Sequence, residues 1–225
     1  MDGAVFLSAG VPDPKRGPEY AKTADTVAIA AAVSALVYVT LGRRQLIWGG
    51  QPAITPMIWT IADEMEIDYG SWVRLYQSKH FQDEFPEENK HFQNVTYTDD
   101  VDKDLNKSLQ EMRRKMFTEN EFTNAVFIGG MGGILDEFEM LRQAQPKINL
   151  IPLVSAGGAA SLVAERMGGG VSDDLKTDLD FVALFHRHLG ISEREERFRT
   201  PQEQPGDVKK RFWSRRGRPT NPGNV

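Results

Sequence analysis

The sequence contains no cysteine. Disulfide bonds, thiolate metal sites and cysteine nucleophiles are therefore excluded. Histidine is also scarce: the four histidines, at positions 80, 91, 186 and 188, show no metal-ligand spacing. His186 and His188 are two residues apart on a predicted helix, so their side chains point to different faces. We predict neither a metal site nor a cofactor.

Long hydrophobic runs are absent as well. The most apolar stretch, 27–41, contains Ser34 and Thr40 and is shorter than the roughly 20 residues that a membrane-spanning helix needs. The N-terminus has no basic region followed by an apolar run, which is the pattern of a signal peptide. We therefore expect a buried helix at 27–41, a cytoplasmic location and no membrane partner.

The 225 residues carry a net charge of −5, with 40% hydrophobic and 26% charged residues. This composition is ordinary for a globular protein, and the length allows one well-packed α/β domain with appendages. Apolar periodicity runs through residues 1–190 and ends there. We predict that 191–225, which is dense in charge and strongly basic near its end, is disordered or forms an extended arm.

Short apolar runs alternate with segments of helical periodicity. Strands are predicted at 4–7, 45–48, 72–76, 94–98, 125–128 and 149–154. Helices are predicted at about 25–41, 54–65, 102–120, 134–141, 159–167 and 179–189, with Thr23 or Asp25 as cap of the first and Thr55 as cap of the second. This βαβ spacing predicts an α/β fold: a three-layer, Rossmann-like, mainly parallel sheet with helices on both faces.

Four predicted strands end in turns of small residues. We expect the following turn residues to bind a ligand: Ser8, Ala9, Gly10, Gly49, Gly50, Gly129, Gly130, Met131, Gly132, Gly133, Ser155, Gly157 and Gly158. Because the carboxyl ends of parallel strands meet at one edge of a sheet, these turns are expected to line one crevice.

The stretch 124–141 combines a buried strand, a glycine turn and a helix start. Unpaired backbone N–H groups and the helix dipole favour an anion at such a position, and glycine allows its close approach. The stretch matches neither a G-x-G-x-x-G fingerprint nor a P-loop. Asp136 and Glu137 in the opening turns indicate a carboxylate near the sugar that carries the phosphate. Charge compensation at the helix start remains an alternative explanation for both acids.

The pair Arg114-Lys115, followed by Ile128-Gly129-Gly130-Met131-Gly132-Gly133-Ile134-Leu135-Asp136-Glu137, resembles the signature of LOG-like proteins. That signature is an Arg-Lys pair and then P-G-G-x-G-T-x-x-E. The sequence differs at Ile128 and Gly133, where LOG enzymes have proline and threonine. The motif's acid is Asp136 in the strict register and Glu137 in a looser one. LOG enzymes are phosphoribohydrolases, and the wider SLOG superfamily includes DprA-type proteins and domains that sense nucleotide-derived signals.

The resemblance implies a domain that binds a small nucleotide derivative of the ADP-ribose type. It implies roles for Arg114, Asp136 and Glu137, either in N-glycosidic cleavage of a nucleoside 5'-monophosphate or in holding the ribose and phosphate. It also implies a homo-oligomer. A DNA-handling role of the DprA kind is a third reading, for which the basic tail with Phe212-Trp213 is the sign; simple solvation of that tail is favoured over nucleic-acid binding.

Overall fold

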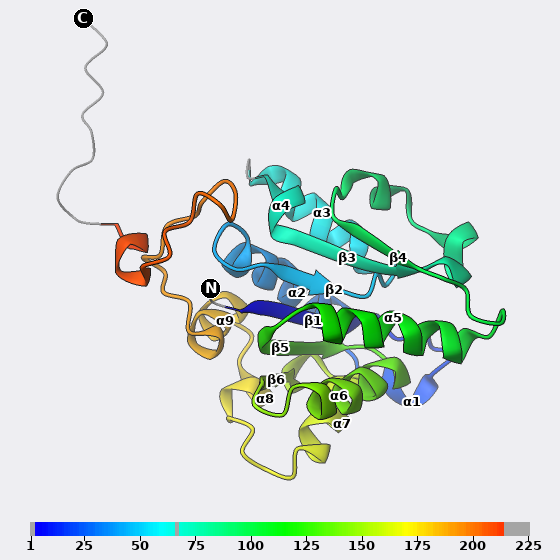
Figure 1. Ribbon diagram of the computed structural model, residues 1–225. Coiled ribbons are helices and arrows are strands. Elements are labelled where there is room, and N and C mark those ends of the chain that lie inside the picture. Colours follow the sequence, from blue (N-terminus) through cyan, green and yellow to red (C-terminus); the bar gives the residue numbers. More distant parts are fainter. Residues whose placement is uncertain (1–2, 66–67, 214–225) are drawn as a thin grey trace, which may run out of the picture.

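The computed structural model describes residues 3–65 and 68–213 of the chain. Six strands form one sheet in the order β4-β3-β2-β1-β5-β6, and every neighbouring pair is parallel (Figure 1). The strands are β1 Ala4–Gly10, β2 Leu46–Trp48, β3 Val73–Ser78, β4 Val95–Thr98, β5 Phe122–Gly129 and β6 Asn149–Leu153. The predicted three-layer α/β fold is confirmed.

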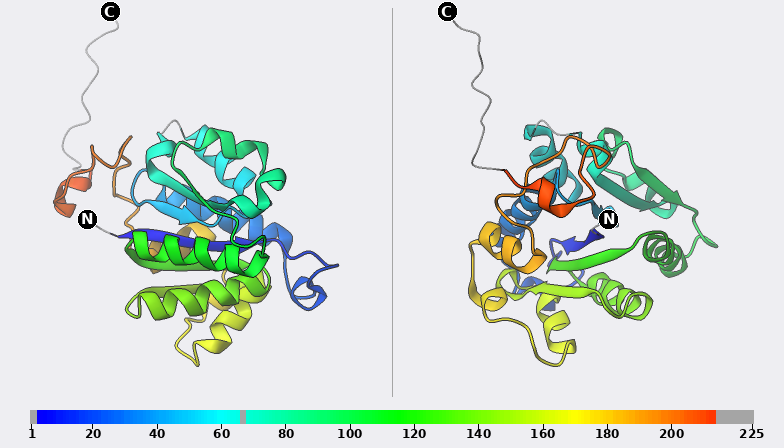
Figure 2. Two further views of the ribbon diagram at one scale, coloured as in Figure 1. Left: turned by 45° about the vertical axis from the view of Figure 1, so that its right-hand side comes forward. Right: turned by 60° about the vertical axis from the view of Figure 1, so that its left-hand side comes forward.

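Helices cover both faces of the sheet (Figure 2). The α-helices are α1 Pro18–Ala21, α2 Thr26–Thr40, α3 Thr55–Glu64, α4 Tyr69–Trp72, α5 Leu105–Glu119, α6 Gly132–Ala144, α7 Ala159–Arg166, α8 Asp174–Thr177 and α9 Phe181–Leu189. The 3-10 helices are η1 Lys79–Glu84, η2 Glu87–His91, η3 Val154–Ala156 and η4 Val208–Arg211. Helices α2, α3, α8 and α9 contribute to one core, and α5, α6 and α7 contribute to the other.

Alternating side chains of the strands feed the two cores. Val5 and Leu7 of β1 face the α2 side, whereas Ala4 and Phe6 face the α5 side. This period of two is inherent in extended backbone. Apolar residues therefore follow one another without interruption in the central strands, because both of their faces are covered.

Two helix starts show how local sequence sets the element boundaries. The Asp25 carboxylate accepts hydrogen bonds from the backbone N–H groups of Val27 and Ala28, which makes it the cap of α2. The start of α3 differs from the prediction, because Thr55 is its first residue and makes no capping bond. Instead, the Gln51 side-chain oxygen accepts from the N–H groups of Ala53 and Ile54.

The strand order places a topological switch in the middle of the sheet. From β1 the chain moves outward through β2, β3 and β4, and then returns to the opposite side of β1 to form β5 and β6. The connections on the two sides of β1 diverge at its carboxyl end, which is where open α/β sheets place their ligand crevice.

From the end of α9 to residue 213, the chain is packed against the domain and is not a disordered tail. It runs along the amino end of the sheet, near the N-terminus (Figure 1). The Glu195 side chain is only 1% exposed and accepts hydrogen bonds from Arg44, and the Trp72 indole N–H donates to the carbonyl groups of Phe198 and Arg199. These contacts fix the segment as a packed, extended arm. Most of the basic tail, residues 214–225, lies outside the described residues.

Within 3–65 and 68–213, no helix is both long enough and apolar enough to span a bilayer.

Candidate functional site

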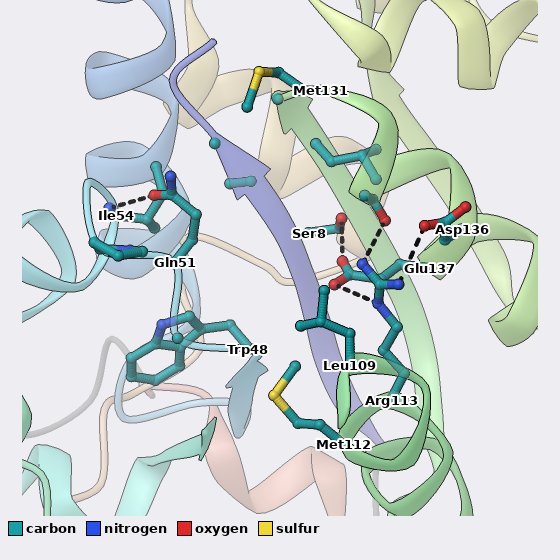
Figure 3. Close-up of a pocket in the computed structure, with 18 of the residues that line it drawn as sticks. Ser8, Trp48, Gln51, Ile54, Leu109, Met112, Arg113, Met131, Asp136 and Glu137 are labelled. Carbon is teal, nitrogen blue, oxygen red and sulfur yellow. Dashed lines mark hydrogen bonds and ion pairs between the residues drawn. The ribbon is translucent and has the colours of Figure 1, made fainter. Parts of the chain in front are cut away.

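A cavity of about 420 Å³ opens at the carboxyl ends of β1, β2 and β5 (Figure 3). This volume lies within the range of roughly 300–1,000 Å³ that is usual for small-molecule sites. The cavity therefore occupies the crevice that the strand order predicts.

Two glycine tips meet at the floor of this cavity. The Gly130 N–H donates to the Gly10 carbonyl over 2.6 Å, and a Cβ on Gly10 would lie 3.3 Å from the Gly130 Cα. Gly130 itself has φ +70°, in the left-handed region that favours glycine. The ends of β1 and β5 are thus brought so close that the backbone forms the cavity surface.

Glu137 of α6 is the central carboxylate of the site. The Ser8 hydroxyl donates to one of its oxygens over 2.5 Å, and the Arg113 Nε donates to the other over 3.4 Å. The Glu137 side chain is 15% exposed. Ser8 comes from β1, Arg113 from α5 and Glu137 from α6, so three elements converge on this group (Figure 3).

Arg113 connects three parts of the cavity wall. Its side chain is only 7% exposed, and besides Glu137 it donates to the Asp136 carboxylate over 3.2 Å and to the Gly133 carbonyl over 3.2 Å. A Cβ on Gly133 would lie 3.1 Å from the Arg113 guanidinium. The glycine that replaces the threonine of the LOG signature therefore leaves room for this arginine.

The opposite wall of the cavity comes from β2 and the residues that follow it. The Trp48 and Gln51 side chains lie across the cavity from Ser8 and Glu137, and Leu109 and Met112 of α5 form an apolar boundary (Figure 3). Gln77 and Phe81, at the end of β3 and in η1, extend this wall. The site thus has one strongly polar side and one side that is largely apolar and aromatic.

Most of the residues predicted from the turns, and both acids predicted from the helix start, line the cavity. Those that do are Ser8, Ala9, Gly10, Gly49, Gly50, Gly130, Met131, Gly133, Asp136 and Glu137. The Gly129, Gly132, Ser155, Gly157 and Gly158 residues are not among the lining residues.

The tip of β6 has a packing role instead. A Cβ on Gly158 would come within 2.7 Å of the Gly129 backbone, and the Gly158 N–H donates to the Thr23 hydroxyl. The Ala159 N–H donates to the Gly130 carbonyl over 3.0 Å. This tip therefore supports the glycine turn from behind rather than lining the cavity.

Arg114 does not reach the site. Its side chain is 60% exposed and forms an ion pair of 2.7 Å with Glu111 on the outer side of α5. The resemblance implied that Arg114 lies at the site, but the arginine that lies there is its neighbour Arg113. The helical spacing contains the signal for this assignment: Arg113 follows Leu109 by four residues and precedes Met116 by three, so it belongs to the buried face of α5.

The comparison with protein families agrees with this geometry. The SLOG cluster3 family model matches residues 19–189, which is more than half of the chain. The chain belongs to the SLOG cluster3 family. Membership of this family supports a nucleotide-related binding or processing domain. Comparisons with curated proteins and with solved structures gave no match.

Proposed function

We propose that this SLOG domain binds a nucleotide-derived ligand of the ADP-ribose type and acts as a sensor of that ligand. The observation that carries the proposal is Glu137, held between Ser8 and Arg113 in a cavity that begins at a glycine turn and a helix start. A phosphate, a ribose and a base each have a chemically matched part of this cavity.

The phosphate fits at the start of α6. Met131 precedes the helix and Gly132 begins it, and the first N–H groups of a helix have no partner within it. The helix dipole adds a favourable field for an anion. Gly133, which lines the cavity, lets an oxyanion approach the backbone closely.

The ribose fits against the two acids. Carboxylate oxygens accept hydrogen bonds from a pair of vicinal hydroxyl groups, and such charge-assisted bonds are the stronger ones. Glu137 is oriented by Ser8 and Arg113, whereas Asp136 is 65% exposed and has one oxygen on Arg113. The base would then extend toward the Trp48 and Phe81 side of the cavity.

Two features support sensing over hydrolysis. Both Glu137 oxygens already accept a hydrogen bond, which suits a group that holds a ligand in a fixed position. Ile128 and Gly133 also depart from the enzyme signature. A sensor must bind its ligand more tightly in one arrangement than in another. We propose that these arrangements are homo-oligomers of the chain.

Hydrolysis of a nucleoside 5'-monophosphate is the alternative function. It is favoured by the retention of two acids and a buried arginine at one site, because a carboxylate stabilises the positive charge that develops on the ribose in N-glycosidic cleavage.

The binding proposal is tested by thermal unfolding of the purified protein with ADP-ribose, cyclic ADP-ribose, NAD and AMP. A ligand present at 100 times its Kd stabilises the folded state by about 2.7 kcal/mol. We expect at least one nucleotide to raise the Tm and Glu137→Gln to reduce that increase. An unchanged Tm with every nucleotide would contradict the proposal.

A product assay separates the two functions. The protein is incubated with AMP and related monophosphates, and the free base is measured by chromatography. A sensor gives no base release beyond one equivalent. Release over many turnovers that disappears in Glu137→Gln would establish the hydrolase instead.

A further inference from the structure

The acidic residues that line the cavity outnumber the basic ones. Two arginines, Arg16 and Arg113, stand against three acids, Glu84, Asp136 and Glu137. The Nε and both terminal nitrogens of Arg113 each donate to Glu137, Asp136 or the Gly133 carbonyl. The positive charge of Arg113 is therefore already neutralised by its protein partners.

Arg16 is the other cation of the cavity lining, and its guanidinium has no ion pair among the contacts of the described residues. Its backbone is held in a tight turn, since the N–H groups of Arg16 and Gly17 donate to the Asp13 carbonyl over 3.1 and 2.9 Å. A Cβ on Gly17 would lie 2.9 Å from the Met131 sulfur. The turn is thus packed directly against the residue that precedes α6.

We propose that Arg16 binds the phosphate of the ligand, and that the cavity prefers an internal phosphate, which is bonded on both sides and carries one negative charge, to a terminal phosphate monoester. This inference rests on the proposed function. It adds both a binding residue outside the glycine turn and a class of ligand. The class includes cyclic nucleotides, whose phosphate is a diester, and ADP-ribose, in which each of the two phosphates has one ester and one anhydride bond.

The preference follows from charge. A terminal phosphate carries about −1.5 to −2 charges at pH 7, whereas an internal phosphate carries one. ADP-ribose has two internal phosphates, so its total charge is close to that of AMP but the charge at each phosphate is smaller. One guanidinium balances one negative charge, and its planar fork pairs with two phosphate oxygens. Glu84, which lines the same cavity, adds repulsion that grows with the charge of the phosphate bound by Arg16.

Arg16→Gln is the decisive variant, and Lys15→Gln is its matched control. Both residues are exposed cations of the same turn, but Lys15 is not part of the cavity lining. Binding of cyclic AMP, ADP-ribose, AMP and adenosine is measured by calorimetry. We expect Arg16→Gln to weaken binding of the phosphate-bearing ligands by about tenfold or more, and to leave adenosine unchanged. Lys15→Gln should match the wild type throughout.

The charge preference is tested by comparing the affinities of the ligands for the wild type and for Glu84→Gln. Wild-type protein should bind cyclic AMP or ADP-ribose more tightly than AMP, and the tighter of the two shows whether the internal phosphate belongs to a cyclic diester or to a diphosphate. Glu84→Gln should improve the affinity for AMP more than that for cyclic AMP, because it removes repulsion from a more highly charged ligand.

The outcomes distinguish this inference from the proposed function. If the wild type binds none of these four compounds and neither NAD nor cyclic ADP-ribose, the proposed function fails. If it binds nucleotides but Arg16→Gln binds them equally well, or loses adenosine to the same extent, then only the role of Arg16 is overturned. Tighter binding of AMP than of both cyclic AMP and ADP-ribose would overturn the charge preference. The Tm of unliganded Arg16→Gln should equal that of the wild type, since the Arg16 side chain makes no hydrogen bond or ion pair with residues 3–65 or 68–213.

Discussion

A glutamate with low solvent exposure is paired with arginine at each end of the sheet. At the carboxyl end, Glu137 pairs with Arg113 and faces the cavity. At the amino end, Glu195 pairs with Arg44 at 2.6 Å and with Arg211 at 3.7 Å, and the C-terminal arm covers it. The chemistry of the two pairs is the same, but only the first is reachable by a ligand.

The remaining hydrogen bonds explain this difference. Around Glu195 the arginines also bind backbone carbonyl groups: Arg43 donates to the Glu195 carbonyl and Arg211 to that of Pro205. Burial lowers the pKa of Arg43 to about 10, which reflects how little solvent surrounds this cluster. The Glu195 cluster therefore joins the arm to the domain, whereas the Glu137 cluster leaves carboxylate surface for a ligand. A buried ion pair indicates a functional site only when it borders a cavity.

The largest expected effect is that of Glu195→Ala. Removing one partner of a buried ion pair leaves its arginines uncompensated and costs about 3 kcal/mol of unfolding free energy. Urea unfolding should show this loss, while nucleotide binding well below the Tm stays at the wild-type level. Glu193→Ala, at an exposed position of the same segment, should change stability by less than about 0.5 kcal/mol. Loss of nucleotide binding in folded Glu195→Ala would contradict the claim that the Glu195 cluster only joins the arm to the domain.

Arg113→Met should have a smaller effect on stability and a clear effect on binding. The variant keeps the length of the side chain but leaves Glu137 with Ser8 alone, so we expect a loss of about 2 kcal/mol and a weaker nucleotide affinity. Arg114→Met is the adjacent control, and its exposed ion pair with Glu111 contributes about 0.5 kcal/mol or less. Equal behaviour of the two variants in unfolding and calorimetry would contradict the assignment of Arg113.

The smallest expected effect on stability is that of replacing Asp174, a partly exposed carboxylate. A hydrogen bond from Ser172, followed by those from His188 and Arg187, holds the pKa of Asp174 well below its usual 3.8. A lowered pKa in the folded state means that the stabilisation is present above about pH 4 and is lost as the pH falls below that value. Asp174→Asn should therefore cost about 1 kcal/mol at pH 6, discounted for solvent screening.

The measurement for Asp174 is a pH series of urea unfolding. The difference between wild type and Asp174→Asn should shrink below pH 4. Asp173→Asn, at a side chain that is 93% exposed, should show a much smaller difference at every pH. A constant difference from pH 6 to pH 2 would mean that the charge of Asp174 does not contribute to stability.

The sheet could be predicted because its strands are buried on both faces. The runs 4–7 and 125–128 combine β-branched and aromatic residues without a polar interruption, and these become parts of β1 and β5. Short helices such as α1, α4 and α8 were not predicted. Four residues do not show a helical period, so their conformation follows from the contacts around them.

The candidate site could be predicted only in part, and the reasons are geometric. The glycine turns predict which strand ends form the site, because parallel strands align their carboxyl ends. Some of these strand ends face the cavity, and others pack behind a neighbouring strand end. Which of the two occurs depends on the strand order and on packing such as that of Gly158 on Gly129. The choice between Arg113 and Arg114 likewise depends on a rotation of about 100° along the helix.

The central place of β1 in the sheet constrains how the protein is made. Its residues pair on one side with β2 and on the other with β5, which the ribosome produces more than one hundred residues later. Such distant pairing must overcome the entropy of closing a long loop, so it forms late and slowly. Ser8 is therefore synthesised long before Glu137, and a nascent or truncated chain that stops short of α6 should have no ligand affinity at all.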